Sequence, residues 1–187
     1  MFDSYKGAGL STINHTYDTA GDHQISIRGI FPHIYLGQNS SYGQKLLSVD
    51  QWGDVQWSSM HAAFSHAYNL SILAEDTPNL SKVTDMSQMF YSAINLTGNF
   101  NNWNTSKVQN MQYLFAYANN FDSPLANWKL TKVRDLQYMF QGTYIFNQDL
   151  SSWDLSGATN LSYMFQDAQG FNGSLSGWDT HTVTSMQ

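Results

Sequence analysis

The chain has 187 residues, of which 42% are hydrophobic and 15% aromatic, so it is long and apolar enough to bury a core. Its net charge of −6, with only 8 lysines and arginines, excludes the basic surface on which nucleic-acid binding depends. Cysteine is absent, which excludes disulfides and thiolate metal sites, and no apolar run approaches the roughly 20 residues that a membrane span requires.

The first part of the chain predicts a β-hairpin. Two segments of strand-like composition, residues 12–17 and 24–30, are separated by a turn-forming stretch at residues 19–22. The sequence from Asn14 to Ile27 resembles the closing hairpin of PKD-type immunoglobulin-like domains, although too little chain surrounds it for such a sandwich. We therefore expect residues 1–48 to form a β-hairpin cap and a linker, with the cap covering the first layer of a repeat.

A period of 25 residues governs the rest of the chain, from residue 49 to residue 187. It is seen in three columns of apolar residues: Val83, Val108, Val133, Ala158 and Val183; Phe90, Phe115, Phe140 and Phe165; Trp103, Trp128, Trp153 and Trp178. A shared period of this length predicts a solenoid, in which each repeat packs on its neighbours. The last five residues open a further repeat, so we expect the chain to be a fragment of a longer protein.

Each repeat contains two patterns with different periods. The start at Leu150, Trp153 and Leu155 matches the strand of a leucine-rich repeat, with alternate residues inward. Apolar residues at helical spacing follow, and a residue suited to a helix N-cap precedes them: Asp85, Asn110, Asp135, Asn160 and Ser185. The sequence thus predicts an α/β repeat, a right-handed leucine-rich-repeat-like solenoid of about five coils, each with a short strand and a short helix.

The repeat resembles a known family. The strings at Val83–Phe90 and Phe146–Asp154 are similar to the repeat of BspA-type bacterial surface proteins, which is also found in mycoplasma-type lipoproteins. The resemblance implies exposure on a bacterial surface or secretion, and adhesion or recognition rather than catalysis. It implies a host or neighbouring-cell protein or glycan as the partner, but it carries no binding residues that can be transferred. The chain departs from the pattern at Pro78, Thr143 and Ala158.

Two sets of outward-facing residues are candidates for ligand binding. The first would lie on the concave face of the solenoid, the usual recognition surface of such folds. It comprises Asn102, Asn104, Lys129, Asp154, Asp179 and His181. The second is a tyrosine ladder of Tyr113, Tyr138 and Tyr163, which could bind a sugar or a protein, or could equally stabilise neighbouring coils by stacking. The tryptophan column is expected to be core.

No catalytic motif is present, so we expect no enzyme activity. The six histidines show no metalloprotease spacing, and nucleophile-elbow, phosphate-loop and dinucleotide-binding motifs are absent. No cofactor and no metal site are predicted, although the neighbouring carboxylates Asp154 and Asp179 could attract a cation. Two alternatives to a binding module stay open: a structural spacer in a large adhesin with no ligand of its own, and, more remotely, a carbohydrate-active solenoid enzyme.

Overall fold

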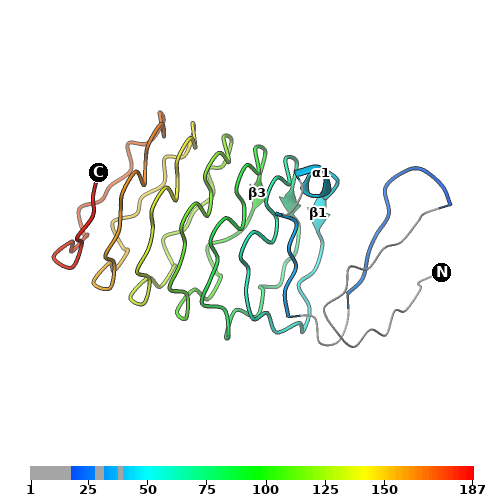
Figure 1. Cartoon of the computed structure of the whole chain (residues 1–187), viewed down its shortest axis with the longest axis horizontal. Helices are drawn as coiled ribbons and strands as arrows, with labels where there is room; N and C mark the ends of the chain where they lie inside the picture. Colours follow the sequence, from blue (N-terminus) through cyan, green and yellow to red (C-terminus); the bar gives the residue numbers. More distant parts are fainter. Residues whose placement is uncertain (1–17, 28–31, 38–39) are drawn as a thin grey trace.

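The computed structural model describes residues 18–27, 32–37 and 40–187, and it shows a stack of coils that follow one another along the chain (Figure 1). Three short strands, β1 (Ser48–Val49), β2 (Ser71–Ile72) and β3 (Thr97–Gly98), form a parallel sheet in that order. Parallel bridges then join residues exactly one repeat apart, and they run along one column: Asp85, Asn110, Asp135, Asn160 and Ser185. From Asp85 onward the 25-residue period is therefore the register in which neighbouring coils lie, whereas the strands of the first coils pair Ser48 with Ser71 and Ser71 with Thr97.

The prediction of a short helix in every coil is wrong. Within the described residues the sole helix is α1 (Ser40–Gly43), which precedes the first coil, and the fold is therefore not an α/β solenoid of strands and helices. The expected N-cap residues instead form tight turns with their own chain. The Asp85 carboxylate accepts a hydrogen bond from the Ser87 amide at 2.8 Å, and the Asp135 carboxylate accepts one from the Gln137 amide, also at 2.8 Å.

Left-handed backbone conformations explain why the apolar stripe does not become helical. In the second coil, Gln88 and Ser92 have φ values of 55° and 56°, whereas an α-helix needs negative φ at every residue. The amides of Gln88 and Phe90 donate to carbonyls of the next coil at 2.9 Å, while the Tyr91 amide donates three residues back to Gln88 at 3.1 Å. Alternate amides thus bind the neighbouring coil, and apolar residues at helical spacing still face inward.

The prediction of a strand at the leucine-rich start of each repeat is also wrong. Residues 103–105 and 153–155 are irregular, and turn bonds such as Trp153 N–H to the Leu150 carbonyl at 3.1 Å shape this part of the coil. A side chain contributes to the coil–coil contact in place of a backbone ladder: the Thr105 hydroxyl donates to the Lys129 carbonyl at 3.0 Å and accepts from the Lys129 amide at 2.9 Å. In the described part of the chain the three β-strands lie at another position of the coil, and they occur only in the first coils.

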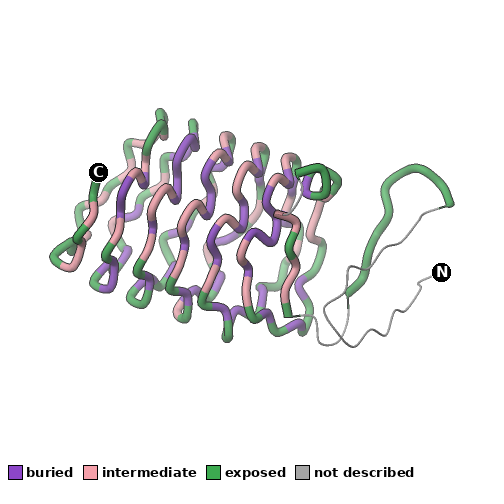
Figure 2. Tube along the Cα trace, viewed as in Figure 1, coloured by how far each residue is buried: buried purple, intermediate pink, exposed green. Residues whose placement is uncertain are grey.

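The predicted β-hairpin cap is not formed by the residues that the structure describes. The first arm, residues 12–17, lies outside them, as do residues 28–30 of the second arm and residues 14–17 of the segment that resembles a PKD-type domain. Residues 18–27 contain no strand, are exposed throughout and lie beyond the end of the stack (Figures 1 and 2). The 48/49 domain boundary stays a prediction.

A different segment covers the first coil. The Ser58 amide donates to the Pro32 carbonyl at 2.8 Å, and the Leu36 amide donates to the Ala62 carbonyl at 3.3 Å. The glycine that ends α1 permits close packing, because a Cβ at Gly43 would lie 2.2 Å from the Ser65 carbonyl oxygen. The cap therefore consists of residues 32–37 together with α1.

The core is built from aromatic stacks that run through the coils, and buried residues line the inside of the stack along its length (Figure 2). Phe90, Phe115 and Phe140 lie parallel at centroid distances of 5.7 Å. The tryptophan column is core, as predicted: Trp128 and Trp153 are 2% and 0% exposed. Each indole N–H donates to a carbonyl of the preceding coil, at 2.8 Å for Trp128 and 3.0 Å for Trp153, so burial leaves neither group unpaired.

Candidate functional site

The predicted tyrosine ladder exists, and its geometry determines what it can offer a ligand. Tyr113 and Tyr138 are stacked at 4.6 Å with 10° between their planes, and Tyr138 and Tyr163 are stacked at 4.8 Å with 11°. The ring faces in this stack therefore cover one another. The ladder presents ring edges and phenol hydroxyl groups to solvent, so its three members stabilise the contact between coils as well as forming a surface.

The backbone explains why tyrosines project here. All three ladder residues have φ between 56° and 57°, and in each coil they lie two residues before the inward-facing phenylalanine. A second column of left-handed residues follows four positions later and includes Tyr117 and Gly142, at φ 59° and 66°. The three residues between the two columns are buried in the coils of Tyr113 and Tyr138, whereas the left-handed tyrosines are partly exposed, so one outer side of the coils carries large polar side chains.

An open hollow of about 700 Å³ lies on this side of the molecule. It is lined by side chains from four successive coils: Gln88, Tyr91, Tyr113, Tyr117, Tyr138, Gln141 and Gln166. At one end of the hollow the rings change orientation. Tyr91 meets Tyr117 at 5.5 Å with 85° between the planes, and it meets Tyr113 at 6.2 Å with 73°. These three residues, which we call the tyrosine corner, offer ring planes at right angles rather than a parallel stack.

Two small residues shape the hollow. Tyr91, Ala116, Gln141 and Gln166 occupy one column at intervals of 25 residues, and all of these except the fully buried Ala116 line the hollow. In the coil of Tyr113 and Tyr117 that column therefore contributes a methyl group instead of a long side chain. Gly142 supports the ring of Tyr117, because a Cβ at Gly142 would lie 2.9 Å from its Cδ1 atom.

The hollow is neutral and polar. Its lining contains no lysine, arginine or carboxylate. Burial raises the pKa of Tyr91 and of Tyr113, with the neighbouring phenols adding to the effect, so both phenols stay protonated at neutral pH. The Gln141 amide donates to Gln166 at 2.9 Å, which holds the two amides in a row along the stack. The arrangement can donate and accept hydrogen bonds and can contact apolar or cationic groups with its rings.

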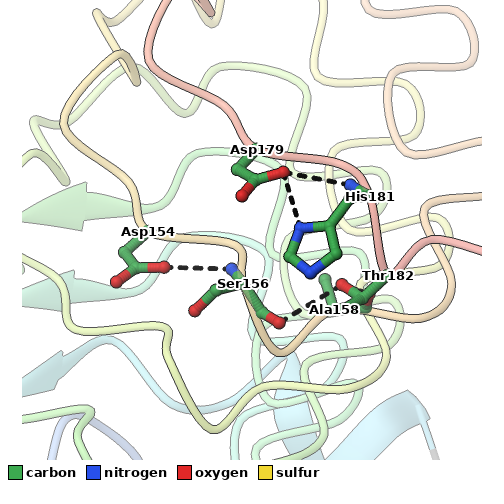
Figure 3. A network of polar contacts seen from close by, with 6 residues as sticks. All are labelled: Asp154, Ser156, Ala158, Asp179, His181 and Thr182. Atoms are coloured by element: carbon green, nitrogen blue, oxygen red, sulfur yellow. Dashed lines mark hydrogen bonds and ion pairs between the residues drawn. The ribbon is translucent and has the colours of Figure 1, made fainter.

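The other predicted set lies on a different part of the coil, and all of its members are exposed: Asn102, Asn104, Lys129, Asp154, Asp179 and His181. Several of these side chains hydrogen-bond to the backbone of their own turn (Figure 3). The Asp154 carboxylate accepts from the Ser156 amide at 3.0 Å, and the Asp179 carboxylate accepts from the His181 amide at 3.1 Å and contacts His181 Nδ1 at 2.7 Å. Hydrogen bonding from the side chain and then the amide of Ser156 lowers the pKa of Asp154, and hydrogen bonding from the side chain and then the amide of His181 lowers the pKa of Asp179. Their role in binding a ligand stays a prediction.

Neither a metal cluster nor a membrane-spanning helix is seen in the part of the chain that the structure describes. No group of three or more histidine, aspartate and glutamate side chains in residues 18–27, 32–37 and 40–187 is placed to hold a metal ion. No helix in those ranges is long and apolar enough to cross a bilayer.

Sequence reasoning missed several residues of the hollow, namely Tyr91, Tyr117, Gln141 and Gln166. Tyr91 and Tyr113 are 22 residues apart, so a search along single columns does not join them. The signal that could have found them is the comparison of neighbouring columns, because the column of Tyr91 passes through Ala116, which lies between Tyr113 and Tyr117 in the next coil.

Comparison with known proteins places the chain in a family. No curated protein and no solved structure matches it. The family model described as "Mycoplasma protein of unknown function, DUF285" matches residues 58–175, which is more than half of the chain and includes every residue that lines the hollow. The chain therefore belongs to the DUF285 family of Mycoplasma proteins.

Proposed function

We propose that the chain is a non-enzymatic binding module of a bacterial surface or secreted protein, and that it holds a protein or glycan through the tyrosine–glutamine hollow. The observation that carries this proposal is the lining itself, in which four tyrosines and three glutamines from four coils line an open hollow of about 700 Å³. Tyrosine supplies a large contact area with few rotatable bonds, and amides supply hydrogen bonds in both directions. Such a set recognises a surface without changing it chemically.

The resemblance of the repeat to BspA-type surface proteins supports the same role and an extracellular location. Membership of a Mycoplasma family agrees with a bacterial source. Solenoids present extended surfaces to which successive repeats contribute side chains. The hollow fits that mode of recognition because no single coil provides it.

The experiment compares two surfaces of the same molecule. The purified chain is applied to a glycan array and to pull-downs from cell-surface extracts. Two variants are tested beside it: Tyr113→Ala with Tyr138→Ala, and the triple variant Asn104→Ala, Lys129→Ala and Asp154→Ala. We expect the double variant to lose the binding signal and the triple variant to keep it. Loss of the binding signal in the triple variant alone would place the binding site at Asn104, Lys129 and Asp154 instead of in the hollow.

A structural spacer is the second candidate, and one observation favours it. The rings of Tyr113, Tyr138 and Tyr163 cover each other at 4.6 and 4.8 Å, as expected of side chains that tie coils together. A spacer predicts no signal on the array and none in the pull-down, whereas a binding module predicts at least one signal that the tyrosine variant removes.

A further inference from the structure

The tyrosine corner differs from the rest of the ladder in the part of the ring that it can present. In the ladder, ring faces lie against ring faces at 10–11°. In the corner, Tyr91 lies at 73° to Tyr113 and at 85° to Tyr117. Because the planes are nearly perpendicular, a compact group seated in the angle contacts more than one ring face.

The face of an aromatic ring carries negative charge density and attracts cations, most strongly when the cation is poorly hydrated. The lining brings no lysine or arginine that would repel a cation, and the whole chain carries 14 acidic against 8 basic residues. Nor does the lining contain a carboxylate that would favour a small, strongly hydrated ammonium ion through a salt bridge. These features favour a cation whose charge is spread over methyl groups.

We propose that the tyrosine corner of Tyr91, Tyr113 and Tyr117 binds a quaternary ammonium group of the ligand. The inference rests on the proposed binding function and specifies the chemistry of that site. The three rings enclose the methylated nitrogen, and the amides of Gln88 and Gln141 along the hollow hydrogen-bond to the polar part of the ligand that carries it. The hollow of about 700 Å³ has room for both parts.

The shape of the corner depends on Ala116. This residue occupies the column of Tyr91 and Gln141 and lies between Tyr113 and Tyr117 in the chain, where it contributes a fully buried methyl group instead of a long side chain. A glutamine at position 116 would place in the corner the side chain that the column carries one and two coils later. Ala116→Gln is therefore a variant that fills the site with a residue the repeat already accepts.

The first test needs no variant. Choline and its neutral carbon isostere, dimethylbutanol, are titrated into the chain at constant ionic strength, and binding is followed by NMR of the tyrosine ring protons. The two probes have the same shape and differ in charge. We expect choline to bind at least about tenfold more tightly, which corresponds to about 1.4 kcal/mol. Equal affinity for the two probes, or no binding of choline, overturns the proposal.

Variants then locate the site. Tyr117→Ala and Ala116→Gln are each expected to weaken choline binding about tenfold or more. Tyr163→Phe serves as the matched control, because Tyr163 belongs to the ladder but does not line this hollow, and it is expected to bind choline as the original chain does. Circular dichroism and urea unfolding identify any variant that fails to fold. Choline binding that survives in folded Tyr117→Ala and Ala116→Gln contradicts the proposed position.

The source of the ammonium group is found with two further probes, vesicles of phosphatidylcholine compared with phosphatidylglycerol, and a peptide with trimethyllysine compared with unmodified lysine. Preference for either methylated probe supports the proposal and identifies whether the ammonium group belongs to a lipid or to a protein. If choline does not bind while a glycan or protein signal is still lost in the variant with alanines at positions 113 and 138, the ammonium proposal is wrong and the binding function stands.

Discussion

Replacement of Trp128 by alanine tests whether the tryptophan column is structural. The ring is 2% exposed, packs against Phe115 at a centroid distance of 5.9 Å, and donates its N–H to the Phe100 carbonyl at 2.8 Å. Burial of roughly 200 Å² at about 25 cal/mol per Å² corresponds to about 5 kcal/mol, and measured Trp→Ala changes in cores cost about 3–5 kcal/mol. Loss of the hydrogen bond is part of that figure, at about 1 kcal/mol. We therefore expect Trp128→Ala to lower the free energy of unfolding by about 4 kcal/mol.

Urea unfolding followed by tryptophan fluorescence and circular dichroism provides the assay. With a slope of about 2 kcal/mol per M, the midpoint should fall by about 2 M. Trp178→Ala is the control, because the same type of indole bond, at 2.8 Å to the Leu150 carbonyl, is present but the ring is only partly buried. Trp178→Ala should lower the free energy of unfolding clearly less than Trp128→Ala does. A change below about 1 kcal/mol for Trp128→Ala, combined with loss of ligand binding, would refute the assignment of this column to the core.

Three further predictions concern stability. Ile145 follows Asn95 and Asn120 in one column, and the Asn120 side-chain amide donates to the Asn95 side chain at 2.7 Å. Ile145→Asn would extend this row by one hydrogen bond, so its free energy of unfolding, measured with urea, should be about 0.5–1 kcal/mol higher than that of Ile145→Ser. Gly142→Ala should lower it by about 1–2 kcal/mol and reduce choline binding, because φ is 66° there and the new Cβ would meet the Tyr117 ring; an unchanged urea midpoint would contradict this. The pKa of Asp154 is lowered from 3.8, so its contribution to stability is present above that value and is lost as the pH falls through the folded-state pKa. The urea midpoint should therefore fall less between about pH 5 and about pH 3 in Asp154→Asn than in the original chain.

Much of the packing could be predicted from the sequence, because the period of 25 residues identifies which residues face inward regardless of the local backbone. Phe115, Phe140 and Trp153 are all fully buried, as the columns predict. The period also gives the register, since bridges join residues such as Asp135 and Asn160. What the period cannot give is the path of the chain within each coil.

The error about helices has a definite physical origin. Met111, Leu114 and Phe115 have the spacing of one helical face. In the structure the same residues are buried by an irregular backbone in which Tyr113 and Tyr117 are left-handed. Aspartate and asparagine before the stripe are equally suited to a helix N-cap and to a two-residue turn. The hydrogen bonds between coils decide between the two, and these bonds are not visible in one repeat taken alone.

The candidate site could be predicted in part. The ladder of Tyr113, Tyr138 and Tyr163 is evident as a column, and the structure confirms that its members stack. The corner with Tyr91 could not be predicted, because it depends on ring orientation between neighbouring columns.

The small residue at Ala116 has a consequence for how such a surface could change. Since each column repeats the same backbone position in every coil, exchanging the residues at 116 and 141 would move the short side chain of that column from one coil to the next, about 4.8 Å along the stack. The aromatic columns of Phe115 and Trp153 would keep their residues in such an exchange. In a repeat protein of this kind, point substitutions in one column can therefore shift the proposed site along the stack, and the residues that differ between repeats are the ones to compare when it is located.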